Sequence, residues 1–440
     1  MTKPSWRHGK VRDMYQINSN VLAMVQSNRQ SAFDQHICDI KNKGHVLTQT
    51  AAWWFKKIMD MGLCETHYLA HRDNVMFVTP CRPIAIEVVV RGYITGNTST
   101  SMWVNYEKGV RDYCGIKLDD NYVKNQKLDE PLITPTTKGE KDELISPKQI
   151  LEMNYLTSLE WELIEKTAMM LYKYGVIEAE KKGLILVDTK YEFGYAPNGH
   201  IVLMDEVHTC DSSRYWIKET YKKHFEEGNE PEKYDKDIVR YWIKENIKDK
   251  TEYAYKIPQS VKITATNAYL NFYERLTGTM VVVNNTFDLN DVDMDVWDSP
   301  EQKMREWATH IFPSCVIISG SVKDNDHCQK IMESMSDIIV SVYYSCSAHK
   351  NTPKLLKLLK RYKKHKKTVF VTVAGMSNAL SGVVACNTSA PVIACPPFKD
   401  NTDMMLNINS SLMCPSDVPV MTVVSPGNAA TCVKRILDLE

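Results

Sequence analysis

The sequence predicts two domains of different fold class, an α+β domain followed by a doubly wound α/β domain with a parallel sheet. Up to about Gly278, strand-like and helical runs are mixed without strict alternation, which is typical of α+β folds. From Cys315 onwards, short apolar runs alternate with helical runs, as in a parallel sheet covered by helices. The stretch between them is acidic and rich in Asn, which indicates a connector. We therefore expect domains over residues 1–278 and 314–440, joined by a connector over 279–313.

The elements follow from the spacing of apolar residues. In the first domain we expect strands over 21–25, 76–78, 87–90, 184–187 and 201–204, and helices over 47–61, 155–181 and 253–276. The connector holds one short helix over 301–310. In the second domain we expect strands over 315–318, 338–344, 369–373, 392–395 and 420–424.

A basic run over 354–367 contains eight Lys or Arg in fourteen residues. Such a cluster can bind RNA. However, Leu355, Leu358, Leu359 and Tyr362 fall at helical spacing, which favours the solvated face of an amphipathic helix.

Composition narrows the function classes. Lys plus Arg and Asp plus Glu number 54 each, so the net charge gives no argument for nucleic acid or a membrane as partner. The first residues lack the apolar core of a signal peptide, and no apolar run approaches the ~20 residues of a membrane span. The twelve Cys include no Cys-x-x-Cys pair and are typical of reduced thiols. We expect a cytoplasmic enzyme with small-molecule substrates.

Acidic side chains surround a predicted hairpin in the segment LILVDTKYEFGYAPNGHIVLMDEV. Asp188, Lys190 and Glu192 are two residues apart and share one face of a strand. The Asn-Gly at 198–199 predicts a two-residue type I′ turn, which sets Glu192 opposite Asp205 and Lys190 opposite Val207. Opposed carboxylates destabilise a hairpin unless a cation lies between them.

Magnesium is the cation that fits this hairpin best, because it usually takes one or two protein carboxylates and fills its other positions with water and phosphates. The hairpin therefore predicts a magnesium–nucleotide site. The alternative is a surface hairpin with solvated acids.

Cationic loops lie elsewhere in the first domain. Gly9, Lys10, Val11 and Arg12 form a glycine turn with two cations, suited to phosphates. Further candidates are Arg91 after the strand that carries Glu87, Lys138 in the loop TPTTK, and Arg214 after Ser213. Each loop alone is also compatible with surface decoration.

In the second domain, polar loops follow the predicted strands. Ligands of parallel sheets bind outside the carboxyl ends of the strands, so these loops are candidates for one crevice. His349 is the only His among them, and its alternative is a structural role. The candidates by loop are Ser321 and Asp324; Ser347 and His349; and Ser377 and Asn378.

A family resemblance rests on motifs in the first domain. GKVRDMY, SAFDQ, NKGHVLTQ, VVRGYITG, TPTTK, DTKYEFG, DEV and DSSRYW occur in the order seen in SAICAR synthetases, and the resemblance covers residues 6–278. It implies ATP-dependent ligation of L-aspartate to carboxyaminoimidazole ribonucleotide, with Mg²⁺ as cofactor. Asn28 and Tyr241 depart from the family pattern, which usually has Asp at both positions.

The same resemblance implies roles for the candidate residues. Gly9, Lys10, Val11, Arg12 and Glu87 would bind the nucleotide, and Glu192 with Asp205 would hold magnesium. Asp188 and Lys190 would be catalytic. The ribonucleotide would be bound by Arg91, Ser213 and Arg214, with Ser31 and Asp34 on the substrate side.

The second domain resembles AIR carboxylases of the ATP-independent animal type, which act on aminoimidazole ribonucleotide and CO2. The resemblance rests on GSxxD, SAHK, VAGxSN and NTxxPVIxCPP, and covers about 314–440. It implies that Ser321, Asp324 and Ser347 bind the ribonucleotide, that His349 transfers a proton and that Ser377 and Asn378 close the pocket. Animal relatives form octamers through this domain, which implies a homo-oligomer. Ser319, Lys323 and Met376 depart from the family pattern.

Three interpretations remain at this point. The first is a bifunctional enzyme of purine biosynthesis. The second keeps the ligase and treats residues 314–440 as a catalytically inactive assembly module. The third is a nucleotide- or RNA-binding protein without catalysis.

Overall fold

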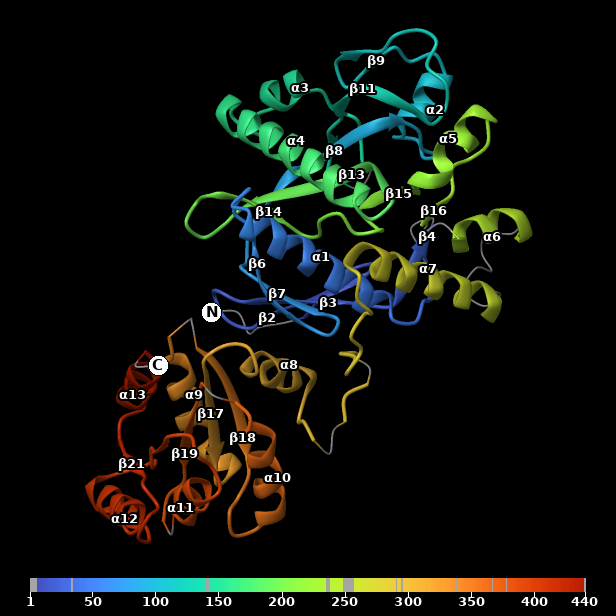
Figure 1. Cartoon of the computed structure of the whole chain (residues 1–440). Coiled ribbons are helices and arrows are strands. Elements are labelled where there is room, and N and C mark those ends of the chain that lie inside the picture. The colour runs from blue at the N-terminus through green and yellow to red at the C-terminus, as the bar shows by residue number, and fades with distance from the viewer. Residues whose placement is uncertain are drawn as a thin grey trace. The chain divides into compact units, whose positions relative to one another are not determined.

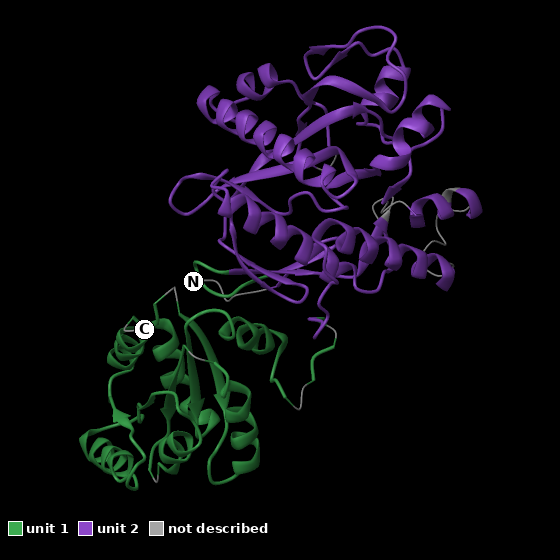
Figure 2. Cartoon of the chain, in the orientation of Figure 1, with its two compact units in different colours: residues 1–4, 15–21, 288–440 green, residues 5–14, 22–287 purple. Residues whose placement is uncertain are grey.

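The computed structural model describes residues 6–32, 35–139, 142–234, 238–247, 257–289, 291–293, 296–336, 339–365, 367–376 and 378–438. The chain divides into two compact units, shown in different colours in Figure 2. The larger unit comprises residues 5–14 and 22–287, and the smaller unit comprises residues 1–4, 15–21 and 288–440.

The larger unit is an α+β fold built on two antiparallel sheets (Figure 1). One sheet has the order β1-β2-β3-β7-β6, with β1 (Trp6–His8), β2 (Arg12–Gln16), β3 (Leu22–Gln26), β6 (Tyr68–Arg72) and β7 (Val75–Val78). The other has the order β11-β8-β13-β15-β16, with β8 (Arg82–Ile94), β11 (Gln126–Ile133), β13 (Leu184–Tyr195), β15 (Ser213–Ile217) and β16 (Lys233–Tyr234). On this second sheet β12 (Thr136–Thr137) pairs with β8, and β14 (Ile201–Met204) pairs with β13. Two small pairs complete the strands: β4 (Arg29–Ala32) with β5 (Gln35–Asp39), and β9 (Asp112–Tyr113) with β10 (Ile116–Lys117).

The helices of the larger unit pack on these sheets. They are α1 (Lys43–Asp60), α2 (Met102–Glu107), α3 (Pro147–Glu152), α4 (Ser158–Glu180), α5 (Lys218–Glu226), α6 (Ile238–Asn246) and α7 (Gln259–Thr277). Figure 1 shows α1 between the two sheets, and its Trp54 and Phe55 are fully buried in a core that also contains Tyr191 and Tyr215 of the second sheet. The predicted helices over 47–61 and 155–181 correspond to α1 and α4. The first residues of the helix predicted over 253–276 lie outside the described part of the chain.

The hairpin between β13 and β14 contradicts the predicted register. Glu192 pairs with Met204 and Tyr195 with Ile201, so Asp205 is not opposite Glu192. The loop has three residues rather than two, because the Ala196 N–H donates to the His200 carbonyl at 2.9 Å. Gly199 alone in this loop has a positive φ, 84°, as expected for a three-residue hairpin loop that ends in a left-handed residue. The extra loop residue shifts each strand partner by one, so that Glu192 lies opposite Met204. Lys190 was predicted to lie opposite Val207, but its N–H donates to Ser212 O at 3.0 Å.

The smaller unit contains a doubly wound parallel sheet, which confirms the predicted fold class. Its strand order is β18-β17-β19-β20-β21, and all described pairs are parallel. The strands are β17 (Ser314–Ser319), β18 (Val340–Ser345), β19 (Thr368–Val373), β20 (Val392–Ala394) and β21 (Met421–Thr422). The helices are α8 (Pro300–Thr309), the 3₁₀ turn η2 (Val322–Asp324), α9 (Asn325–Glu333), α10 (Thr352–Tyr362), α11 (Ala379–Cys386), α12 (Asn401–Leu412) and α13 (Pro426–Asp438).

Alternate residues of each strand face two separate cores. Val316 and Ile318 pack with α10 and α11, whereas Cys315 and Ile317 pack with α9 and α13. This two-residue period follows from the pleat of a strand, and it explains why the strands are apolar throughout. On α10 the four apolar side chains predicted to form its inner face are buried, which confirms an amphipathic helix with a basic outer face.

Two expectations concern the whole chain. All twelve Cys are free thiols, which agrees with the absence of a disulfide framework. Within the described ranges, no helix combines the length and the apolar character needed to span a bilayer.

A close contact at the start of α1 yields a stability prediction. A Cβ atom added to Gly44 would lie 2.3 Å from the Gln26 carbonyl oxygen, so Gly44→Ala should lower the free energy of unfolding of the larger unit by about 1–3 kcal/mol. In the control Gly382→Ala, within α11, the atom nearest to the added Cβ lies 3.9 Å away. The free energy of unfolding should rise by about 0.5–1 kcal/mol, because Ala favours a helix more than Gly does. Urea unfolding measures both, and equal stability of Gly44→Ala and the unchanged chain would contradict the prediction.

Candidate functional site

A cleft of about 390 Å³ opens over the second sheet of the larger unit. β8, β13 and β15 contribute its floor, and the turn after β8, the β14–β15 loop and α6 contribute its walls. Six residues that the sequence singled out line it together: Glu87, Arg91, Asp188, Lys190, Ser213 and Arg214.

Lys190 joins two carboxylates that face each other across strands. Glu87 on β8 is the cross-strand partner of Glu192 on β13. Lys190 Nζ donates to Glu87 Oε1 at 2.6 Å and to Glu192 Oε1 at 3.1 Å, and Lys138 forms a further ion pair with Glu192. The opposed acids anticipated from the sequence therefore exist, but Glu87 takes the place assigned to Asp205, and the cations are lysines.

These contacts fix the charges of the Lys190 cluster. Burial raises the pKa of Glu192, but Lys190 and Lys138 outweigh burial and lower this pKa to about 2. Burial alone would lower the pKa of Lys190, but Glu192 and Glu87 raise it above the ordinary lysine value. Burial raises the pKa of Glu87, which shares its single lysine with Glu192. Lys190 and Glu192 are therefore charged at neutral pH.

Asp188 lies between two arginines at the next position on the same face of β13. Its Oδ2 accepts from Arg214 on β15 and lies 3.6 Å from a guanidinium nitrogen of Arg91 on β8. Arg91 is also held by Thr134, whose Oγ1 accepts from Nε at 2.9 Å. Asp188 and Arg91 are both more than nine-tenths buried, so this ion cluster has little solvent around it. Two fixed guanidinium groups suit an anionic ligand such as a phosphate or carboxylate.

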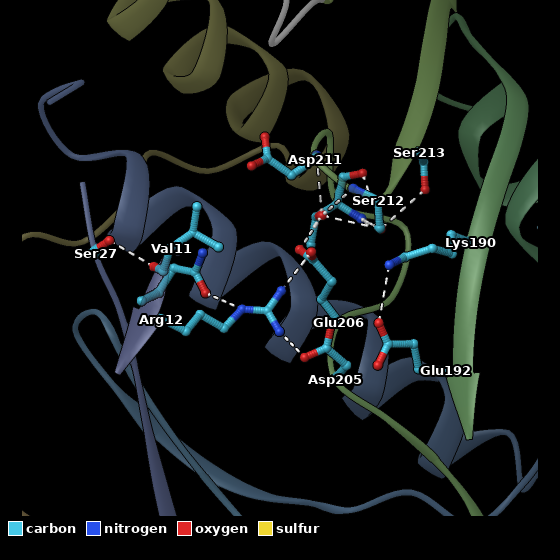
Figure 3. A network of polar contacts seen from close by, with 12 residues as sticks. Val11, Arg12, Ser27, Lys190, Glu192, Asp205, Glu206, Asp211, Ser212 and Ser213 are labelled. Atoms are coloured by element: carbon cyan, nitrogen blue, oxygen red, sulfur yellow. Dashed lines mark hydrogen bonds and ion pairs between the residues drawn. The ribbon is translucent and has the colours of Figure 1, made fainter. Parts of the chain in front are cut away.

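Arg12 extends from β2 towards the end of β14, as Figure 3 shows. Its guanidinium forms ion pairs with Asp205 and Glu206, the second at 2.6 Å, and its Nε donates to Gln26 Oε1 at 2.6 Å. Asp205 follows directly after the strand partner of Glu192, and its φ of 68° turns the chain out of the sheet. Glu206 lines the cleft, so Arg12 connects the glycine turn to the cleft wall.

The glycine turn itself is held by side chains around it. The Gly9 N–H donates to Arg12 O at 2.8 Å, and Arg29 donates to Gly9 O at 3.1 Å and to Lys10 O at 3.2 Å. Val11 O accepts from the Ser27 hydroxyl at 2.7 Å. The turn is thus held in one conformation by hydrogen bonds from residues on both sides of it.

Two substrate-side predictions remain, Ser31 and Asp34. Ser31 is on β4 opposite His36 and is not among the described residues that line the cleft. Asp34 lies outside the described residues.

Glu206 and Asp211 line the cleft but were not named as site residues from the sequence. They lie in the motifs DEV and DSSR, so proximity to named motifs was the available signal. Lys138, a cationic candidate from the sequence, pairs with Glu192. The residues that these side chains bind lie far from them in the sequence, so no local pattern reveals the contacts.

In the smaller unit, the candidate residues follow three neighbouring strands at one edge of the sheet. Ser321 caps η2, with its Oγ accepting from the Lys323 N–H at 3.2 Å, and burial raises the pKa of Asp324. Ser347 Oγ accepts from the Lys350 N–H at 3.2 Å, and His349 is exposed. Asn378 caps α11 and donates to Ser411 Oγ at 2.9 Å, which ties it to α12. Ser377 lies outside the described residues.

β17 lies between β18 and β19, so the strand order reverses beside β17. Ligands of doubly wound sheets bind at this point, outside the carboxyl ends of the strands. Ser321 and Asn378 follow β17 and β19, the two strands that flank the reversal, and His349 follows β18.

Comparison with known proteins identifies both parts of the chain. The model of the family described as SAICAR synthetase matches residues 5–257. The phosphoribosylaminoimidazole-succinocarboxamide synthase of Legionella pneumophila (strain Paris) is 44% identical over 287 residues, which are 64% of this chain and 91% of that protein. The solved SAICAR synthase from Saccharomyces cerevisiae, complexed with SAICAR, is 30% identical, covers 63% of this chain and 96% of its own, and has a TM-score of 0.55.

The chain belongs to the SAICAR synthetase family. The family described as AIR carboxylase matches residues 314–440, so an AIR carboxylase domain is fused behind the SAICAR synthetase domain. Both are enzymes of purine biosynthesis, a ligase and a lyase, and the chain combines the two.

The departures of the SAICAR synthetase domain have structural explanations. Asn28 Oδ1 accepts from the Gly44 N–H at 3.1 Å at the start of α1, which an Asp carboxylate oxygen would also do. Tyr241 lines the cleft, and its hydroxyl accepts from Lys233 Nζ at 2.7 Å, so it contacts a cation where the family has an anion.

The departures of the AIR carboxylase domain differ in environment. Ser319 is fully buried at the end of β17, with Oγ 2.7 Å from the Tyr343 hydroxyl. Lys323 is exposed, and Met376 is 82% exposed with a φ of 55°. Nothing in the structure explains why Lys323 and Met376 replace the family residues.

The charge of Glu192 predicts a dependence of stability on pH. The pKa of Glu192 in the folded chain is about 2, below the ordinary value of 4.5, so its ionisation stabilises the fold above about pH 4.5. Glu192→Gln should therefore lower the free energy of unfolding at pH 7, and the difference from the unchanged chain should shrink as the pH falls from 4.5 towards 2.

The matched control for this measurement is Glu162→Gln. Glu162 is an exposed residue of α4 paired with Lys166, and its substitution should have a small effect at every pH. Urea unfolding at a series of pH values tests both variants. A difference for Glu192→Gln that does not change with pH would contradict the assignment.

Proposed function

We propose that the cleft of the larger unit ligates L-aspartate to the carboxyl group of carboxyaminoimidazole ribonucleotide (CAIR), using ATP, to give SAICAR. The observation that carries this proposal is the placement of two ion clusters on one strand. Lys190 with Glu87, and Asp188 with Arg91 and Arg214, line the same cleft, and Glu192 lies behind Lys190 as its second partner. The first suits a nucleotide with its metal, and the second suits an anionic ribonucleotide.

The chemistry asks for positioning and charge rather than for a protein nucleophile. A carboxylate is a poor electrophile until one oxygen is phosphorylated, and phosphoryl transfer depends on orientation and cationic charge. In the proposed arrangement, the turn of Gly9, Lys10, Val11 and Arg12 holds ATP phosphates, with Glu87 at the nucleotide. Arg91, Ser213 and Arg214 bind the ribonucleotide, with Ser31 and Asp34 on the substrate side. Asp188 and Lys190 lie beside the reacting groups.

Lys190 is suited to the transferred phosphoryl group. Its raised pKa keeps it cationic at neutral pH, and its partners Glu87 and Glu192 hold its ammonium group at a fixed point. A fixed cation stabilises charge that develops in the transition state without reorganisation. The amino group of aspartate then displaces phosphate from the activated carboxyl group, which forms the amide bond.

Glu192 and Asp205 are proposed to hold Mg²⁺ when ATP is bound. Among the described residues, no group of three His, Cys, Asp or Glu side chains is arranged as a metal site. The donor set fits magnesium nevertheless, because this ion usually takes one or two protein carboxylates together with water and phosphates. Glu192 lies on β13 and pairs with Met204 of β14, and Asp205 is the residue after Met204. Bound magnesium would neutralise phosphate charge.

The smaller unit is proposed to carboxylate aminoimidazole ribonucleotide (AIR) with CO2, without ATP. Ser321, Asp324 and Ser347 would bind the ribonucleotide, His349 would transfer the proton, and Ser377 with Asn378 would close the pocket. Support comes from the position of these loops at the point where the strand order reverses. The product of this unit would be the substrate of the ligase unit.

Location and assembly are also proposals. We propose a cytoplasmic homo-oligomer, an octamer as the resemblance to animal enzymes implies, formed through the smaller unit. Five large apolar side chains on or beside α12 are exposed, which supports an interface there: Phe398, Met405, Leu406, Leu412 and Met413. Light scattering of the purified chain measures the oligomeric state.

The two activities can be separated by substitution. Asp205→Asn or Lys190→Met should lower SAICAR formation from CAIR, ATP, Mg²⁺ and L-aspartate by about 100-fold or more, because each removes a charge proposed to hold ATP or its magnesium. Carboxylation of AIR should remain. His349→Ala should do the reverse.

Assays of the unchanged chain provide the reference. Each assay contains ATP, Mg²⁺ and L-aspartate. SAICAR formed both from AIR with bicarbonate and from CAIR without bicarbonate supports two active sites. SAICAR formed from CAIR but not from AIR would mean that the smaller unit serves assembly only, and no product from either would contradict the proposed function.

A further inference from the structure

A buried ion cluster lies behind the β14–β15 loop, and we propose that it positions this loop for ligation. The Asp211 cluster, as we name it, consists of Asp211, Lys43, Tyr269 and Gln30. The proposal rests on the ligase function proposed above and adds residues that were given no role from the sequence. Lys43 and Tyr269 are not among the described residues that line the cleft, so they are positioning rather than catalytic residues.

Lys43 is the first residue of α1 and is only 1% exposed. Lysine is almost never buried to this extent unless it is paired. Its Nζ lies 3.1 Å from Asp211 Oδ2 and donates to Gln30 Oε1 at 3.0 Å and to Arg29 O at 3.2 Å. Gln30 and Arg29 accept two of the three ammonium donors, and the Asp211 carboxylate balances the positive charge.

Tyr269 of α7 holds the other oxygen of the same carboxylate. Its hydroxyl donates to Asp211 Oδ1 at 2.7 Å. Burial, and then the charge of Asp211, raises the pKa of Tyr269 well above its ordinary value, so the phenol keeps its proton and remains a donor. Both carboxylate oxygens of Asp211 are therefore fixed by helices far away in the sequence.

The loop that carries Asp211 has little other regular support. Residues 205–212 leave the sheet after β14, and Asp205 and His208 have positive φ values of 68° and 51°. The conformation of the loop is consequently set by side-chain bonds. At its start, Thr209 Oγ1 donates to Glu206 Oε2 at 2.6 Å, and Arg12 binds the other oxygen of Glu206.

The residues after Asp211 contact β13, the strand that carries the proposed catalytic residues Asp188 and Lys190. Ser212 O accepts from the Lys190 N–H at 3.0 Å, Ser213 Oγ donates to Thr189 Oγ1 at 2.7 Å, and Arg214 pairs with Asp188. A displacement of Asp211 would therefore move Ser213 and Arg214 relative to the strand that carries Asp188 and Lys190. Gln30, the remaining member, precedes Ser31 on β4, so the cluster also sets a second segment of the proposed substrate side.

The test is kinetic, with the full chain. Lys43→Met should lower kcat/KM for CAIR by about 100-fold, the effect of misplacing a binding group by about 1 Å, with a raised KM. Tyr269→Phe keeps the shape of the ring and removes one hydrogen bond, and it should lower kcat/KM by about 5–10-fold, as expected for loss of one bond to a charged group. The second variant keeps the test valid if Lys43→Met does not fold.

A double variant separates positioning from stability. Lys43→Met leaves a buried carboxylate without its cation, and adding Asp211→Asn removes that charge, so urea unfolding should show recovered stability. Ligation should stay impaired in the double variant, because the amide cannot restore the lost contacts. Recovery of ligation together with stability would overturn the proposal.

The matched control is Lys57→Met. Lys57 lies on the same helix and pairs with Glu178 at 2.7 Å. Its loss should leave kcat and the KM for CAIR unchanged. Unchanged kinetics in both Lys43→Met and Tyr269→Phe would overturn the inference while the proposed ligase function stands. Absence of SAICAR formation by the unchanged chain would instead overturn the proposed function.

Discussion

The ligase cleft depends on Lys190, which lies between two carboxylates that the sheet places face to face. β8 and β13 set Glu87 opposite Glu192, and like charges in such a pair destabilise the strands. Lys190 binds both at 2.6 and 3.1 Å, and Lys138 adds a second cation on Glu192. Two cations balance two anions in a mostly buried site, which makes a charged strand face compatible with a folded core.

The alternation of side chains along β13 then places two kinds of site next to each other. Asp188, Lys190 and Glu192 share one face, so successive members are about 6–7 Å apart along the strand. Arg91 and Arg214 flank the first of them, and Glu87 and Lys138 flank the last. The sites proposed for an anionic substrate and for nucleotide phosphates thus lie next to each other on one strand. Phosphoryl transfer between bound molecules needs this closeness.

The sequence predicted the elements and the charged residues better than their partners. The strand at Ile201–Met204 agrees with β14 residue for residue, and the helix predicted over 301–310 agrees with α8 to within one residue at each end. Glu87, Asp188, Lys190 and Arg214 were named for the site and do line one cleft. The hairpin register was wrong because a three-residue loop replaced the expected two-residue turn. The Lys190–Glu87 pair joins residues 103 apart, and the Tyr269–Asp211 pair joins residues 58 apart, so no local pattern contains them.

The two sites of this chain use polar groups in opposite ways. In the larger unit, charged side chains on antiparallel strands pair with one another and leave a cleft lined by ions. In the smaller unit, Ser321 and Asn378 cap helical turns, so their side chains fix backbone groups at the carboxyl ends of parallel strands. All residues proposed for ligation belong to residues 5–14 and 22–287, and all residues proposed for carboxylation belong to 288–440. Because each set lies within one compact unit, a charge removed from one proposed site leaves the residues of the other in place.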